Sequence, residues 1–165
     1  MTQRACRFCA APLTVSFCDL GMSPLSNSFV KATDAHRMER FYPLHAFVCG
    51  ECFLVQLEEF ESPERIFGDY AYFSSYSDSW LDHARRYAEH MTSLLRLGRD
   101  SLVVEIASND GYLLQYFNAA GIQVLGSEPA RNVAETAIAR GIPTMVEFFV
   151  KALAERLTSE GKQAY

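Results

Sequence analysis

The chain has 165 residues, of which 49% are hydrophobic and 21% charged, so it can form a packed core and is not expected to be disordered throughout. Its net charge of −5 argues against a nucleic-acid-binding protein, which usually presents a basic face. The sequence contains no apolar run of about 18 residues and therefore predicts no membrane span.

The N-terminal region begins without the apolar segment of a signal peptide, so we expect a cytoplasmic protein with reduced thiols. Two C-x2-C pairs follow, Cys6 with Cys9 and Cys49 with Cys52, separated by residues 10–48. A two-residue spacer lets both thiolates of a pair reach one ion, and two pairs supply the four sulfurs of a tetrahedral Zn2+ site. The spacing predicts a closed, structural zinc site.

Two alternatives to zinc exist for these cysteines, namely unrelated buried thiols and a redox pair. A redox C-x-x-C pair is disfavoured because neither pair opens a helix after a strand. Cys18 has no partner at the same spacing and is not expected to be a ligand. His36 and His45 are expected to be ordinary loop and strand residues, because four cysteines already complete the site.

The zinc-binding domain is predicted to span residues 1–60. Alternation or apolar character predicts strands at residues 13–17, 41–48 and 53–57, and residues 19–27 are expected to form a loop because they contain Gly and Pro.

A connector with a helix is predicted for residues 61–98. Residues 66–79 are rich in aromatic and hydroxyl side chains, which can bind a polar ligand or pack two domains together. A helix is expected from Trp80 to Leu95, capped by Asp78 or Ser79. Its two histidines, His83 and His90, are not expected to bind metal.

Three strand patterns alternate with three helical patterns in residues 99–165. The strands are predicted at residues 101–106, 122–128 and 144–147, and the helices at residues 112–120, 130–140 and 149–157. This βαβαβα order is typical of one half of a Rossmann-like α/β domain with a parallel sheet.

The turn between the first strand and helix contains Gly111, which lets the backbone approach a ligand closely. Glu128 follows 17 residues later, near the place of a ribose-binding acid. A dinucleotide fingerprint needs three glycines, whereas this turn has only Gly111 and carries Ala107 and Asn109 in place of further glycines, which weakens the interpretation as part of an NAD(P)-dependent enzyme. The plain alternative is an ordinary βα turn.

The heptapeptide at residues 105–111, Glu-Ile-Ala-Ser-Asn-Asp-Gly, resembles motif I of class I S-adenosylmethionine-dependent methyltransferases. It is most similar to the E-I-x-x-N-D-G form of sugar C-methyltransferases, which also carry an N-terminal four-cysteine zinc domain. The resemblance extends over nearly the whole chain and departs from the family pattern at Cys18, at Ala107 and at the chain's end. It implies methylation of a ring carbon in a nucleotide-linked keto-deoxysugar.

The resemblance also implies roles for individual residues. Glu105 would order the loop near the methionine part of S-adenosylmethionine, Glu128 would accept hydrogen bonds from the ribose, and Tyr72 matches an active-site tyrosine. The remaining implied cofactor contacts are Ala107, Ser108, Asn109 and Gly111 through their backbone, and Glu147 with Phe148 around the adenine.

Methylation of a carbon needs a base that forms an enolate and a group that stabilises it. The family's base and acid would follow the third strand of this pattern, so we expect an N-terminal fragment that binds zinc but does not methylate alone. The alternative from another class is a zinc-stabilised binding or scaffold module with a nucleotide-binding half-domain. The sequence specifies neither the sugar nor the oligomeric state.

Overall fold

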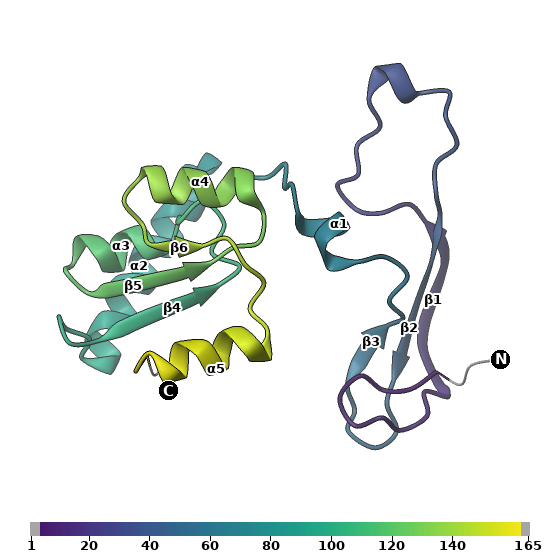
Figure 1. The fold of residues 1–165 in the computed structure, drawn as a ribbon, viewed down its shortest axis with the longest axis horizontal. Coiled ribbons are helices and arrows are strands. Elements are labelled where there is room, and N and C mark those ends of the chain that lie inside the picture. Colours follow the sequence, from purple (N-terminus) through teal and green to yellow (C-terminus); the bar gives the residue numbers. More distant parts are fainter. Residues whose placement is uncertain (1–3, 163–165) are drawn as a thin grey trace. The chain divides into compact units, whose positions relative to one another are not determined.

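The computed structural model describes residues 4–162, which form two compact units with a boundary between Ile66 and Phe67. Figure 1 labels the α-helices and β-strands of both units. Each unit is described by itself below.

The N-terminal unit is built on a three-stranded antiparallel sheet in the order β1-β2-β3. The strands are β1 (Val15–Ser23), β2 (Tyr42–Val48) and β3 (Val55–Leu57). A connection of residues 24–41 joins β1 to β2 and contains the short 3-10 helix η1 (Ala32–Asp34), and helix α1 (Pro63–Phe67) follows the sheet. The cysteine pairs lie at the other end of the β1–β2 hairpin from this connection, as Figure 1 shows.

The expected loop at residues 19–27 is wrong in its first half, because β1 continues to Ser23. The register of β1 against β2 shifts twice, between Ser16 and Cys18 and between Asp19 and Met22. Gly21 lies within the second shift with a φ of 78°, which is the left-handed backbone that a β-bulge accepts most readily from glycine. The glycine that suggested a loop therefore marks an irregularity inside a strand.

The C-terminal unit contains a three-stranded parallel sheet in the order β4-β5-β6. The strands are β4 (Leu102–Ile106), β5 (Gln123–Ser127) and β6 (Thr144–Met145). The helices are η2 (Ser74–Tyr76), α2 (Asp78–Leu95), α3 (Leu114–Ala119), α4 (Arg131–Ala139) and α5 (Lys151–Ser159). Strands and helices alternate from β4 to α5, which confirms the predicted Rossmann-like half.

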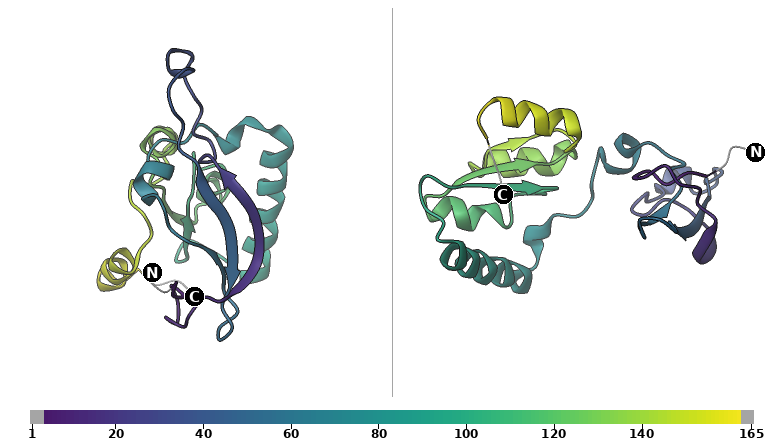
Figure 2. Two further views of the ribbon diagram at one scale, coloured as in Figure 1. Left: turned by 90° about the vertical axis from the view of Figure 1, so that its right-hand side faces the viewer. Right: turned by 90° about the horizontal axis from the view of Figure 1, so that it is seen from below.

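The sheet of this unit is covered on both faces. Val124 of β5 packs in one apolar cluster with side chains of α2, α3 and α4, whereas the adjacent Leu125 packs on the other face with Leu153 and Leu157 of α5. Figure 1 and the right-hand view of Figure 2 show α5 on the side of the sheet opposite to α2 and α3. This two-sided burial explains why the strands are apolar runs without polar alternation.

The helix α2 begins differently from the prediction. The side chain of Ser77, rather than that of Asp78 or Ser79, accepts the hydrogen bond from the Trp80 N–H at 3.3 Å. Ser77 has the extended backbone that an N-cap requires, whereas Asp78 is already helical. Within residues 4–162, no helix combines the length and the apolar character needed to cross a membrane.

Candidate functional site

The four predicted zinc ligands lie together in the N-terminal unit. The Sγ atoms of Cys6, Cys9, Cys49 and Cys52 are all within 4.8 Å of one another, with 3.6 Å between those of Cys6 and Cys52 and 3.5 Å between those of Cys9 and Cys49. Zn–S bonds of about 2.3 Å in a tetrahedron place the sulfurs about 3.8 Å apart. The donor set and its size therefore fit Zn2+.

Both cysteine pairs have the same backbone turn, which explains how the chain presents its sulfurs. The Ala10 N–H donates to the carbonyl of Cys6 at 2.9 Å, and the Phe53 N–H donates to the carbonyl of Cys49 at 3.1 Å. Ala10 and Phe53 each follow the second cysteine of a pair, and their φ angles are 61° and 62°. Two such turns facing each other form the four-sulfur cluster, and Cys18 lies outside it in β1.

A buried glutamine supports one of these sulfurs. Gln56 of β3 donates from Nε2 to the Sγ of Cys6 at 3.2 Å, and its Oε1 accepts a hydrogen bond from the Arg7 N–H at 3.0 Å. The pKa of Cys6 is lowered to about 6, first by the backbone N–H of Cys9 and then by Gln56. A lowered pKa favours the thiolate, which is the state that binds metal.

The loop after β4 is held in an unusual backbone conformation. Ala107, Asn109 and Gly111 have φ angles of 59°, 50° and 77°. The N–H groups of Ala107 and Ser108 both donate to the carbonyl of Ser127, at 2.8 and 3.3 Å, and so tie the loop to the end of β5. Two of the three residues with a positive φ are not glycine, the residue that adopts the left-handed conformation most readily.

Two glycines allow this loop to pack closely. A Cβ added at Gly111 would lie 3.1 Å from Cγ1 of Ile142, and the positive φ there would be strained in any other residue. A Cβ added at Gly126 in β5 would collide with the hydroxyl of Ser108. The loop therefore lies directly against the strand that ends at Ser127.

Glu128 is the first residue after β5 and lies at the centre of the loop's hydrogen bonds. Its Oε2 accepts from the Asn109 N–H at 2.9 Å and its Oε1 accepts from the Ala130 N–H at 2.8 Å. The side chain is almost fully buried. Each carboxylate oxygen has a second lone pair, so Glu128 joins the loop to α4 and keeps acceptor capacity for a ligand.

The buried oxygens without a partner gather on the same segment. Among the described residues, the buried side-chain atoms that lack a hydrogen bond are Glu105 Oε2, Ser108 Oγ and Asp110 Oδ1. All three belong to residues 105–111. Since buried polar atoms are nearly always satisfied, unpaired acceptors concentrated on one loop indicate a ligand site.

Glu105 near the end of β4 has a strongly raised pKa of about 8, chiefly because the side chain is buried, with further increases from the nearby carboxylates of Asp110 and Glu128. Arg140 approaches Asp110, with 3.2 Å between Nη1 and Oδ2. Three carboxyl groups thus converge beside the loop, of which Glu105 is largely protonated at neutral pH and Asp110 is paired with Arg140. The carboxylate of Glu128 remains, and it favours a positively charged ligand.

The aromatic-rich segment is bound to this loop by side-chain amides. Asn109 accepts from the Ser74 N–H at 2.9 Å and donates from Nδ2 to the carbonyl of Tyr72 at 3.1 Å. Asn132 of α4 makes a similar pair of bonds with the backbone of Tyr70, at 3.1 and 2.7 Å. The backbone of Tyr72 therefore lies next to the loop, while its side chain is half-exposed.

The structure places Glu147 and Phe148 just after β6. The Glu147 carbonyl accepts from the hydroxyl of Ser127 at 2.8 Å, so the backbone meets the end of β5. The Glu147 carboxylate is exposed and forms an ion pair with Arg156 of α5 at 2.7 Å. Phe148 is half-buried.

Sequence reasoning missed three contributors to this site. Asn132 lies on α4 and Arg140 is the C-cap residue of that helix. Both are far from the loop in the sequence, and no local pattern relates them to it. Asp110 belongs to the heptapeptide itself, and its position immediately before Gly111 could have identified it.

Comparison with known proteins identifies relatives of both parts of the chain. Residues 6–67 match the family Methyltransf_13, which is described as "Putative zinc binding domain". The chain is also similar to the C-methyltransferase NovU of Streptomyces niveus, with 32% identity over 154 residues, or 93% of this chain. These two matches agree with the four-cysteine cluster of residues 6–52 and with the resemblance of the chain to C-methyltransferases. The chain spans 37% of the length of NovU.

Proposed function

We propose that the whole protein is an S-adenosylmethionine-dependent methyltransferase that methylates a ring carbon of a nucleotide-linked keto-deoxysugar. The zinc cluster and the loop of residues 105–111 would be its structural metal site and its cofactor site. The observation that carries this proposal is the concentration of three unpaired buried oxygens on that loop. The similarity to NovU, whose name describes a C-methyltransferase, supports the reaction class.

The loop's charges suit this cofactor. S-adenosylmethionine carries a positive sulfonium and an ammonium group, whereas the loop brings together the carboxyl groups of Glu105, Asp110 and Glu128. Burial keeps Glu105 largely protonated at neutral pH and Arg140 pairs with Asp110, so Glu128 is the carboxylate that remains without a cationic partner among the described residues. The carboxylate of Glu128 beside the loop would repel the two pyrophosphate charges of NAD(P), which favours the methyltransferase over the dehydrogenase alternative.

Residues of this chain would hold the cofactor and orient the acceptor. We propose that Ala107, Ser108, Asn109 and Gly111 contact it through the backbone, that Glu128 binds the ribose and that Glu147 with Phe148 flanks the adenine. The backbone of Tyr72 is fixed by Asn109, so the phenol is a candidate to position the sugar beside the methyl group. The cofactor supplies the electrophilic methyl group when bound.

The cofactor assignment is tested by calorimetric titration of S-adenosylhomocysteine into the zinc-loaded chain. The variant Glu128→Gln places an amide NH2 against backbone N–H donors, and we expect about tenfold weaker binding or more. The matched control is Glu135→Gln, an exposed carboxylate on α4 that should leave binding unchanged.

Binding of NADH in place of S-adenosylhomocysteine would overturn the proposed cofactor. Absence of binding to a folded, zinc-loaded chain would favour the zinc-stabilised scaffold alternative. The substrate is tested separately, by transfer of a labelled methyl group to sugar nucleotides by the whole protein.

A further inference from the structure

A second concave site lies in the N-terminal unit, at the end of the hairpin away from the cysteines. It is a hollow of about 390 Å3, within the size range of small-molecule sites. The residues that line it come from the β1–β2 connection, from the start of β2 and from α1. Neither the zinc cluster nor the cofactor loop contributes to it.

The hollow collects most of the positive charge of its unit. Its basic residues are Lys31, Arg37, Arg40 and Arg65. Residues 1–66 contain six Lys and Arg in all, so four of the six line this one hollow, whereas only two of the eight Asp and Glu in the same range do. In a chain with a net charge of −5, this is a local reversal of sign.

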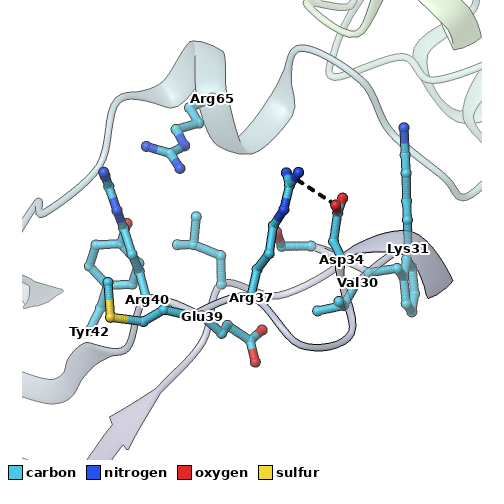
Figure 3. A pocket seen from close by; sticks show the side chains of 12 residues that line it. Val30, Lys31, Asp34, Arg37, Glu39, Arg40, Tyr42 and Arg65 are labelled. Atoms are coloured by element: carbon cyan, nitrogen blue, oxygen red, sulfur yellow. Dashed lines mark ion pairs between the residues drawn. The ribbon is translucent and has the colours of Figure 1, made fainter.

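The basic side chains are brought together by the fold. Figure 3 shows Arg37 and Arg40 extending from the same stretch of the β1–β2 connection toward Arg65, which belongs to helix α1 across the hollow. The carboxylate of Glu39 points away from these guanidinium groups in the same view. Arg37 and Arg40 lie together because they are close in the sequence. The approach of Arg65 to both depends on the fold.

Acidic partners neutralise only part of this charge. Arg37 pairs with Asp34 at 3.1 Å and Arg65 pairs with Glu61 at 2.9 Å. Lys31 and Arg40 form no ion pair with any residue in the range 4–162 that the structure describes. Two cations therefore face the hollow without an ion-pair partner among the described residues, although the charge of Arg40 also acts on Glu61. The guanidinium geometry suits the oxygens of a phosphate.

The remaining lining is apolar or aromatic and largely exposed. Phe29 is 75% exposed and Met38 94% exposed, and Tyr42 lies beside Arg40. Exposed aromatic rings next to guanidinium groups are a surface on which a nucleoside can stack while its phosphates are bound. We propose that this hollow binds the diphosphate group of a nucleoside diphosphate. The inference deepens the proposed function and rests on it only for the identity of the attached sugar.

The experiment measures binding of three probes to the zinc-loaded chain: inorganic pyrophosphate, uridine diphosphate and uridine. We expect both diphosphates to bind, uridine diphosphate more tightly than pyrophosphate, and both to weaken as salt is added. Since diphosphates also chelate free metal, excess zinc is removed first and bound zinc is measured before and after each titration.

The variants distinguish binding at the hollow from non-specific attraction of diphosphate to basic side chains elsewhere on the chain. Arg40→Gln and Lys31→Gln remove exposed cations that make no ion pair in the described part of the chain, and each should weaken diphosphate binding about tenfold. The matched control is Arg86→Gln, an exposed arginine of α2. Its binding should equal that of the wild type.

Three results would overturn the inference: no diphosphate binding by the folded chain, equal binding of uridine and uridine diphosphate, or an equal loss in Arg86→Gln. These results are independent of the cofactor test, because that test measures how the variant Glu128→Gln, in the C-terminal unit, binds S-adenosylhomocysteine. A chain that binds S-adenosylhomocysteine but no diphosphate would refute the hollow alone, and the reverse would refute the cofactor site alone.

Discussion

The replacement Glu105→Gln tests whether burial keeps this carboxyl group neutral in the folded chain. Its pKa is raised from 4.5 to about 8, chiefly by burial. The folded state therefore holds a proton that the unfolded state releases between these values, so stability must fall as pH rises through this window. The protonated Glu105 side chain makes its full contribution to the free energy of unfolding below about pH 4.5, and this contribution is lost once the pH passes about 8.

The size of the loss follows from the pKa values. At about 1.4 kcal/mol per pKa unit, a rise from 4.5 to about 8 sets an upper limit of about 5 kcal/mol. The side chain is partly exposed, so we expect about 2–3 kcal/mol. Glutamine has no proton to lose, and Glu105→Gln should thus match the wild type near pH 5 and exceed its free energy of unfolding by this amount near pH 9.

Urea unfolding across this pH range measures the difference. Trp80 is the chain's single tryptophan and stacks on Tyr112 with ring centroids 5.9 Å apart, so its fluorescence follows the C-terminal unit alone. The control is Glu135→Gln, whose exposed carboxylate should show no such pH dependence. A stability difference that stays constant from pH 5 to pH 9 would refute the argument that burial raises the pKa of Glu105.

Two further predictions concern the zinc cluster and the packing of the loop. Cys49→Ser should lose the bound zinc, because an S4 site needs all four thiolates, whereas Cys18→Ser should keep it; equal zinc content in both variants by metal analysis would refute the ligand assignment. Gly126→Ala should lower the free energy of unfolding by about 1–3 kcal/mol, because the new Cβ meets Ser108. Gly98→Ala, where a Cβ meets nothing within 4 Å, is the matched control, and Ser108→Gly should rescue the alanine variant.

Patterns that are local in the sequence predicted much of the fold. The four zinc ligands followed from two C-x2-C spacings, because a two-residue spacer alone brings both sulfurs of a pair to one ion. The alternation of strands and helices from residue 101 to residue 157 followed from hydrophobic period and from Gly at helix ends. These features depend on residues a few positions apart, so they can be predicted without knowledge of contacts between distant parts of the chain.

Irregular local features were harder to predict, because the same residue type is compatible with more than one local conformation. Gly21 reads as a loop residue, but it occupies a bulge inside β1. Ser77, Asp78 and Ser79 are all good N-cap residues, and only the backbone of the folded chain selects Ser77, which is extended where Asp78 is already helical.

Tertiary structure alone decided how the site is assembled. Glu128 was expected to bind a ribose, but only the parallel pairing of β4 with β5 shows that its two oxygens also hold the loop and the start of α4. The bond of Asn109 to Tyr72 and the approach of Arg65 to Arg37 join residues separated by dozens of positions. Such contacts depend on how sheets and helices pack, and sequence period carries information on which face of an element is buried but not on which distant side chain it meets.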